Sequence, residues 1–178
     1  MVTSYSLKRT ADVLTAIRLL GALVIPVVGL IQGPTAVAGA GGWLLLLLWL
    51  TDLFDGNLAR RSGRAGEGFF GRNDGWVDLA LGWGSFTLLS ITGFVNPWVY
   101  WGVLVATAAL LRVDFLVFQG LATFAWAVLY FTVAVGQDPN YLVGLALFGG
   151  MHLVFSRERF VVLWRRFFEH LGNRLGIG

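Results

Sequence analysis

Residues 42–61 read GWLLLLLWLTDLFDGNLARR, and this stretch decides the fold. A helix that crosses a membrane needs about 20 mostly apolar residues. Leucines and tryptophans fill the first part of the stretch, whereas Asp52, Asp55, Arg60 and Arg61 gather toward its end. Ionisable residues within membrane helices are costly and usually serve a function. The stretch therefore predicts a helix that leaves the lipid at one membrane surface and carries carboxylates to that surface.

The composition of the whole chain argues against several classes of protein. Of its 178 residues, 57% are hydrophobic and 13% are charged, whereas an average soluble domain is about 25% charged. A small domain cannot bury so much apolar surface, so a soluble globular enzyme, a disordered tail and a coiled coil are not expected. The mean hydropathy of +0.73 indicates a chain that lies in lipid. With no cysteine, the chain has no disulfide framework, thiolate metal site or cysteine nucleophile. The formal net charge of +3 gives no support for nucleic-acid binding.

The apolar runs predict an all-α integral membrane protein with one domain over residues 1–178. Residues 1–11 are expected to form a juxtamembrane segment, without the small-residue cleavage site of a signal peptide. The six predicted spans cover residues 12–31, 37–58, 74–95, 98–113, 115–135 and 141–156. Residues 98–135 are too long for one crossing at about 1.5 Å per residue, so a turn is predicted at Arg112 and Asp114.

The placement of charge predicts the orientation. With six spans, one side of the membrane holds three loops, which lie near Gly33, near Asn96 and at residues 136–140. None of the 13 Lys and Arg residues falls in these loops. The positive-inside rule then makes the other side, with both termini, cytoplasmic. We expect a bacterial-type inner membrane with the active site on its cytoplasmic face, and an outer aromatic belt that comprises Trp98, Tyr100, Trp101 and Tyr141.

The C-terminal segment, residues 157–178, is basic and amphipathic. It is interpreted as a helix on the cytoplasmic membrane face that is attracted to anionic lipid. The alternative is a continuation of the last span into water.

Four carboxylates are predicted to share one cleft. Asp52 and Asp55 lie three residues apart, and Asp74 and Asp78 lie four apart, so each pair occupies one helix face. Two antiparallel helices joined by a short loop would bring the two faces together. The four acids would repel one another unless cations lay between them, and oxygen ligands favour Mg²⁺ or Mn²⁺. The alternative is a set of structural ion pairs with the neighbouring arginines, which are Arg60, Arg61, Arg64 and Arg72.

These residues resemble the signature of the CDP-alcohol phosphotransferases, D-x-x-D-G-x-x-A-R followed by G-x-x-x-D-x-x-x-D. Seven of its eight fixed residues are present, and the resemblance covers the whole chain. Phe70 stands where the pattern has glycine, between Gly68 and Gly71, and the gap from Arg60 to Asp74 is one residue longer than usual. The resemblance implies six membrane helices with the motif on the second and third. It also implies an enzyme of phospholipid synthesis in which an alcohol displaces CMP from a CDP-linked lipid such as CDP-diacylglycerol.

The resemblance also assigns roles. Two divalent ions, Mg²⁺ or Mn²⁺, would be held by Asp52, Asp55, Asp74 and Asp78 and would neutralise the pyrophosphate. Asp78 would act as the general base toward the acceptor hydroxyl. The residues expected to bind the nucleotide are Asp52, Gly56, Ala59, Arg60 and Gly71.

Basic residues on the cytoplasmic side are candidates for binding a phosphate on the acceptor. Arg112 is the first candidate, followed by Arg18 and Arg157, and each could instead reach toward lipid headgroups. The run from Thr15 to Arg18, followed by Pro26, is similar to the start of phosphatidylglycerophosphate synthases, so glycerol 3-phosphate is the expected acceptor.

Other functions stay open at this point. Inositol phosphate or another alcohol is the alternative acceptor, and a homodimer is an open alternative for the assembly. A divalent-cation or proton transporter would also place acids in the membrane, but acids near the inner ends of only two spans form no path across. A catalytically silent relative that binds CDP-lipid is the third alternative, because of Phe70.

Overall fold

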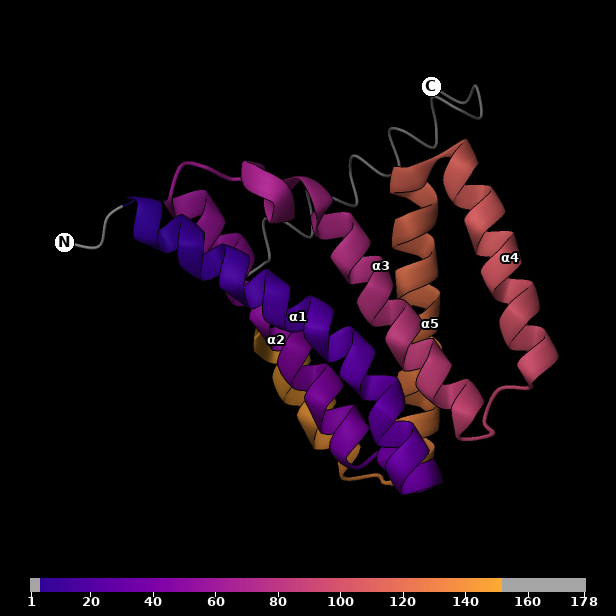
Figure 1. The fold of residues 1–178 in the computed structure, drawn as a ribbon. Helices are drawn as coiled ribbons and strands as arrows, with labels where there is room; N and C mark the ends of the chain where they lie inside the picture. Colours follow the sequence, from indigo (N-terminus) through magenta and orange to yellow (C-terminus); the bar gives the residue numbers. More distant parts are fainter. Residues whose placement is uncertain (1–3, 152–178) are drawn as a thin grey trace, which may run out of the picture.

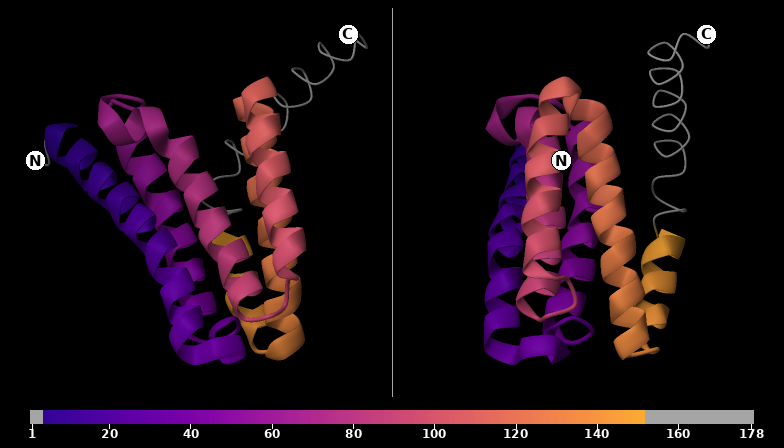
Figure 2. Two further views of the ribbon diagram at one scale, coloured as in Figure 1. Left: turned by 45° about the vertical axis from the view of Figure 1, so that its right-hand side comes forward. Right: turned by 90° about the vertical axis from the view of Figure 1, so that its right-hand side faces the viewer.

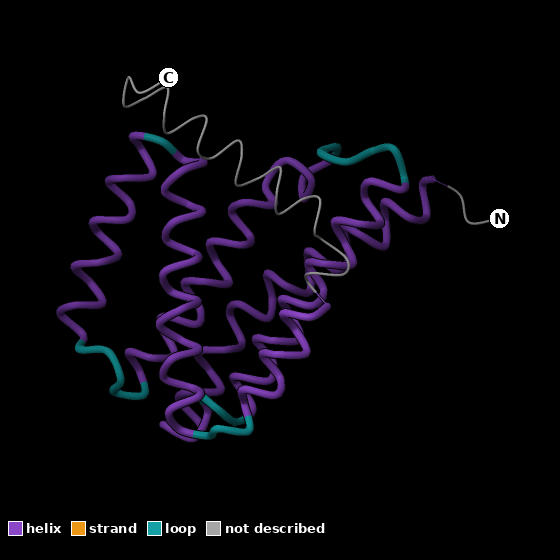
Figure 3. Tube along the Cα trace, turned by 180° about the vertical axis from the view of Figure 1, so that it is seen from behind, coloured by secondary structure: helices purple, strands orange, loops and turns teal. Residues whose placement is uncertain are grey.

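The computed structural model of the chain describes residues 4–151, and these residues are helical, with short connections and no strand (Figure 3). The elements are α1 (Ser4–Gln32), the 3-10 helix η1 (Gly33–Ala36), α2 (Ala40–Arg61), α3 (Gly68–Ile91), α4 (Pro97–Val113) and α5 (Phe115–Gln137). A further helix, Tyr141–Met151, follows α5 to the limit of the described residues. The predicted all-α class is confirmed. The predicted surface helix at 157–178 and the end of the sixth predicted span lie outside the described residues.

The helices run alternately up and down. The connections that follow α1, α3 and α5 lie at one end of the molecule, whereas the α2–α3 and α4–α5 connections and the start of α1 lie at the other (Figure 1). α1 packs against both α2 and α3, and α3 packs in turn against α5, which also contacts α4. α3 therefore lies between the α1–α2 pair and the α4–α5 pair, as the turned views show (Figure 2).

Two helix starts differ from the prediction by more than five residues, because a membrane-span criterion counts only apolar residues, whereas the other boundaries of α1–α5 lie within about four residues of the prediction. α1 begins at Ser4 rather than at residue 12. Its polar first turns continue the helix, with Lys8 Nζ 2.5 Å from Asp12 Oδ1 across one turn. α3 begins at Gly68, and Asn73 interrupts it with a non-helical φ of −112° and ψ of 15°. The kink at Asn73 directly precedes the expected start at Asp74, and the helix continues from there to Ile91.

The predicted turn between the fourth and fifth helices is confirmed. Asp114 separates α4 from α5 in an extended conformation, with φ −153° and ψ 103°. Its side chain accepts a hydrogen bond from Val117 N at 3.1 Å, which is the interaction of an N-cap. The Asp114 carboxylate, at the predicted turn, therefore caps α5.

Small residues let α1 approach its neighbours closely. A Cβ atom at Gly84 of α3 would lie 2.3 Å from the carbonyl oxygen of Ala22 in α1. A Cβ at Gly21 of α1 would lie 2.3 Å from Leu48 Cδ1 of α2. Such contacts are the packing mode of small residues in membrane helices, and they place α1 in close contact with both helices that carry the acids.

Two tyrosines predicted for the aromatic belt lie inside the molecule instead. Tyr141 is fully buried, and its hydroxyl donates to Gly42 O at 2.8 Å. Tyr100 is also buried and accepts a hydrogen bond from Trp83 Nε1 at 2.8 Å. A buried tyrosine needs a partner for its hydroxyl, and Gly42 of α2 and Trp83 of α3 supply one here. Trp98 and Trp101 are exposed, as a belt requires.

Much apolar surface remains uncovered on the outside of the bundle. By length and composition, two stretches within residues 4–151 could cross a membrane, Ser4–Ala36 and Val117–Gln137, and two shorter apolar helices are present. Large apolar side chains are exposed along them, among them Leu20, Leu23, Leu30, Ile31, Val105, Phe124 and Leu147. Contiguous exposed apolar surface of this kind is typical of a protein that contacts lipid or another protein.

Candidate functional site

One face of α1 carries the polar groups at the centre of the site. The buried residues of α1 follow helical spacing, and they change along the helix from polar to small and apolar: Lys8, Ala11, Thr15, Arg18, Gly21, Ala22, Ile25 and Gly29. Arg18 is fully buried and Thr15 is nearly so. Because buried charges are stable only when they are paired and hydrogen-bonded, this face predicts acidic partners on the neighbouring helices.

Arg18 contacts all four aspartates of the motif. Its Nη1 atom pairs with Asp52 Oδ1 and lies 3.2 Å from Asp78 Oδ1. Its Nη2 atom lies 2.5 Å from Asp74 Oδ1 and 3.3 Å from Asp55 Oδ2. One guanidinium thus joins two carboxylates of α2 to two of α3.

Asp55 differs from the other three acids in its surroundings. Its side chain is 5% exposed, whereas those of Asp52, Asp78 and Asp74 are 24%, 29% and 39% exposed. Thr15 Oγ1 donates a hydrogen bond to Asp55 Oδ2 at 2.9 Å. Asp55 therefore lies deepest, between two side chains of α1.

The remaining three acids meet the requirement for a shared cation. One carboxylate oxygen from each of Asp52, Asp74 and Asp78 lies within 4.8 Å of the other two. Three convergent carboxylates are a suitable donor set for Mg²⁺ or Mn²⁺, which prefer oxygen ligands. The predicted convergence of the two acidic helix faces is therefore confirmed.

The helix contacts that bring the two acidic faces together differ from the prediction. The expectation was that α2 and α3, joined by a short loop, would pack directly against each other. In the structure they contact each other at few positions, and each packs extensively against α1. The acids come together because α1 lies against both helices and presents Arg18 to them.

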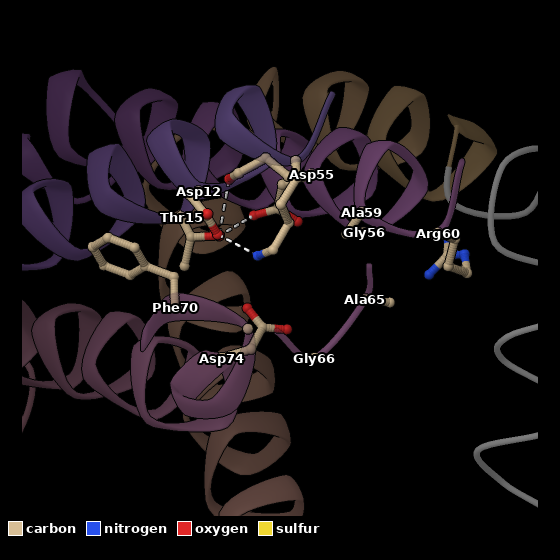
Figure 4. A pocket seen from close by; sticks show the side chains of 13 residues that line it. Asp12, Thr15, Asp55, Gly56, Ala59, Arg60, Ala65, Gly66, Phe70 and Asp74 are labelled. Carbon is tan, nitrogen blue, oxygen red and sulfur yellow. Dashed lines mark hydrogen bonds and ion pairs between the residues drawn. The ribbon is translucent and has the colours of Figure 1, made fainter. Parts of the chain in front are cut away.

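A cavity of about 160 Å³ adjoins the acids. Asp55 and Asp74 border it from α2 and α3, and Thr15 borders it from α1 (Figure 4). The predicted nucleotide-binding residues Gly56, Ala59, Arg60 and Gly71 all line this cavity, while Asp52 lies in the adjoining cluster of acids. The other lining residues are Lys8, Ala11, Asp12, Ala65, Gly66 and Phe70.

Gly71 follows directly after the position at which the motif has glycine, and the structure shows why position 71 requires a glycine. A Cβ atom at Gly71 would lie 2.9 Å from the carbonyl carbon of Gly66, so the first turn of α3 packs on the backbone of the preceding loop. Gly66 itself has φ +81°, a conformation that favours glycine. Phe70, at the position where the pattern has glycine, places its side chain in the wall of the cavity.

The arginines that were considered as structural partners of the acids are exposed and make other contacts. Arg64 Nε pairs with Glu67 Oε2 at 2.7 Å, and Arg72 Nε donates to Gly68 O at 3.2 Å. Arg60 Nη2 donates to Asn57 Oδ1 at 2.8 Å. The guanidinium that holds the four acids is that of Arg18.

The three arginines considered as ligands of the acceptor phosphate differ in where they lie. Arg18 lies among the acids, with both Nη atoms bound to carboxylates. Arg112, the first candidate, is exposed in the last turn of α4 and does not line the cavity. Arg157 lies outside the described residues. A phosphate-binding role for any of them remains a prediction.

Sequence reasoning missed Lys8 and Asp12, which form an ion pair in the cavity wall. The signal that could have found them is the spacing of Lys8, Asp12 and Thr15 at successive helical turns, ahead of Arg18. A polar stripe on an otherwise apolar helix faces the interior of a bundle.

Comparison with known proteins gives one match. The family model described as CDP-alcohol phosphatidyltransferase matches residues 8–164. No curated protein and no solved structure matches the chain significantly. The matched range contains the polar face of α1, the four aspartates and the cavity, so the geometry and the comparison concern the same residues. The chain therefore belongs to the CDP-alcohol phosphatidyltransferase family.

Proposed function

We propose that the protein transfers the phosphatidyl group of CDP-diacylglycerol to glycerol 3-phosphate and releases CMP. The observation that carries this proposal is the convergence of Asp52, Asp74 and Asp78 beside a cavity with glycine and alanine in its walls. The membership of the family supports the transfer of a phosphatidyl group from a CDP-linked alcohol. The choice of glycerol 3-phosphate rests on the similarity of residues 15–26 to phosphatidylglycerophosphate synthases.

The aspartates fit the divalent metal on which this family depends. Asp52, Asp74 and Asp78 would hold Mg²⁺ or Mn²⁺, with Asp55 completing the set for two ions. Such ions would neutralise the pyrophosphate oxygens and stabilise negative charge on the departing CMP.

The side chains around the acids have their own tasks. Asp78, to which the motif assigns the role of general base, accepts the proton of the acceptor hydroxyl, and its side chain is 29% exposed and so open to a substrate. Gly56, Ala59 and Gly71 let the nucleotide lie against helix backbone, and Arg60 borders the same cavity. The alcohol and the nucleotide then meet next to the same acids, as a direct displacement requires.

The proposal places six spans in a bacterial-type inner membrane, and the exposed apolar side chains support contact with lipid. The acids lie in the second half of α2 and the first half of α3. They are therefore nearer the end of the bundle that carries the α2–α3 connection (Figure 1), which would be the cytoplasmic end. Residues 1–178 would form one domain, with residues 157–178 on the membrane surface. The lipid tails of the donor can then stay in the bilayer during the reaction.

The direct test uses the purified protein in detergent with CDP-diacylglycerol, Mg²⁺ and a panel of alcohols. CMP release with glycerol 3-phosphate, absent when EDTA replaces Mg²⁺, is the expected result. Release with inositol phosphate or another alcohol instead would reassign the acceptor. Binding of CDP-diacylglycerol without CMP release for any alcohol would show a silent relative and contradict the proposed activity.

A further inference from the structure

The buried guanidinium of Arg18 has more carboxylates around it than it can neutralise. Its side chain is fully buried, and four aspartates surround it. The formal charge of these five residues at neutral pH is one positive against four negative. Like charges this close destabilise one another unless further cations are present.

The same carboxylates that bind Arg18 are those a metal would need. Arg18 pairs with the Oδ1 atoms of Asp52, Asp74 and Asp78, and these three residues form the set whose carboxylate oxygens lie within 4.8 Å of one another. A guanidinium and a divalent ion at the centre of this set would repel each other, and each would occupy the lone pairs that the other requires.

A second observation shows that Arg18 is incompletely bound in this position. Its Nε atom is buried and has no hydrogen-bond partner in the described structure. A buried donor without a partner costs free energy. The arrangement around the four acids therefore leaves one buried donor of this side chain unsatisfied.

We infer that Arg18 and a divalent cation are alternative counter-ions of the same carboxylates. In the metal-free protein, Arg18 holds the acids of α2 and α3 together, although these two helices contact each other at few positions. When metal binds, the guanidinium gives up Asp52, Asp74 and Asp78. Arg18 is thus a positioning residue that keeps the metal site assembled until it is filled. This inference rests on the metal-binding part of the proposed function.

The test measures binding of Mn²⁺ alone, by electron paramagnetic resonance, to the full-length protein in detergent. Arg18→Gln removes the competing charge, so Mn²⁺ should bind about tenfold more tightly than to the original protein. Arg18→Lys keeps the charge and should bind Mn²⁺ with nearly the original affinity. The matched control is Arg9→Gln, which removes one exposed charge from the same helix and should change nothing.

Thermal unfolding provides a second readout that does not depend on turnover. Without its internal cation, Arg18→Gln should unfold at a lower temperature in EDTA, and Mn²⁺ should raise its Tm more than it raises that of the original protein. If Arg18→Gln folds only in the presence of Mn²⁺, that dependence also supports the proposal, because the metal then replaces the missing internal cation.

The outcomes separate the two proposals. Equal or weaker Mn²⁺ binding by Arg18→Gln, with clear binding by the original protein, would overturn the competition and leave the metal site in place. Absence of Mn²⁺ binding by every variant would overturn both the competition and the metal site. CMP release is measured separately, so a failure of the proposed acceptor would affect neither conclusion.

Discussion

At the scale of single residues, the site is organised by the partners that buried charges require. Asp55 is almost completely buried, and both Arg18 and Thr15 of α1 bind it. Asp78 is more exposed than Asp55, as Asp52 and Asp74 also are. The same residue type therefore occupies two environments here: the Asp55 carboxylate is buried and held by two side chains, and the Asp78 carboxylate is partly exposed.

The accessible carboxylate gives the first prediction. Asp78→Asn keeps the shape of the side chain but removes a base that can act at neutral pH. CMP release should fall by about 10²- to 10⁴-fold, while CDP-diacylglycerol still binds. The control is Asp138→Asn, which removes a carboxylate from the connection at the opposite end of the molecule. Near-normal turnover by Asp78→Asn would show that another group takes the proton.

The buried carboxylate gives the second prediction. Thr15→Val preserves side-chain shape but removes the hydroxyl that donates to Asp55 Oδ2 at 2.9 Å. A hydrogen bond to a charged group contributes about 1.5–3 kcal/mol, so the free energy of unfolding should fall by about that amount. Unfolding in mixed micelles of rising SDS content measures this change. Thr10→Val is the matched control, because Thr10 is exposed on the same helix and its hydroxyl donates only locally, to Ser6 O. Equal loss in the two variants would mean that the bond to Asp55 adds nothing.

At the scale of helices, α1 is the element that assembles the site. It contacts both α2 and α3, which contact each other little. The polar half of its buried face binds the acids, and its small-residue half sets the distance to the neighbouring helices. Helix packing in the middle of the bundle therefore controls where Arg18 and Thr15 meet the aspartates.

This dependence gives the third prediction. Gly84→Ala would place a Cβ atom 2.3 Å from Ala22 O, so α1 and α3 must move apart. Overpacking of this kind costs about 1–3 kcal/mol, and CMP release should fall as well because the polar face of α1 shifts away from the acids. Gly102→Ala in α4 is the control, since its Cβ would meet no atom within 4 Å. Unchanged Tm and turnover in Gly84→Ala would show that the contact between α1 and α3 is easily relaxed.

At the scale of the whole molecule, the two ends of the bundle differ. Arg60, Arg61 and Arg64 lie at the end that carries the acids, and the connections after α1, α3 and α5 lie at the other (Figure 1). At the second end, buried tyrosines fasten the helices to one another, as Tyr130 does when it donates to Val37 O at 2.7 Å. The charged residues and the buried tyrosines thus lie toward opposite ends of the helical bundle.

The fourth prediction concerns the orientation of these two ends in the membrane. The chain has no cysteine, so a single introduced cysteine can be labelled without a background. In intact cells, a membrane-impermeant maleimide should label Asn140→Cys and should leave Arg61→Cys unlabelled until the membrane is opened. Both positions are exposed in the structure. The reverse labelling pattern would place the acids on the outer face and contradict the proposed cytoplasmic site.

The sequence by itself determined the helical class, most helix boundaries, and the pairing of the two acidic helix faces. These features depend on local patterns: the length of apolar runs, the spacing of Asp52, Asp55, Asp74 and Asp78, and the polar turn at Asp114. A helix of known length and period fixes which of its residues share a face, so the convergence of the acids could be predicted before any coordinates.

The tertiary structure decided which helix joins those faces and which cation lies between them. The spacing of residues along one helix does not state which neighbour it packs against, so Arg18 could be taken for a phosphate ligand, and Lys8 and Asp12 could be overlooked. The exposure of Arg112 and the burial of Tyr141 depend in the same way on contacts between helices far apart in sequence. Whether a polar side chain meets lipid, water or a partner is a property of packing, and packing is fixed only when all the helices are in place.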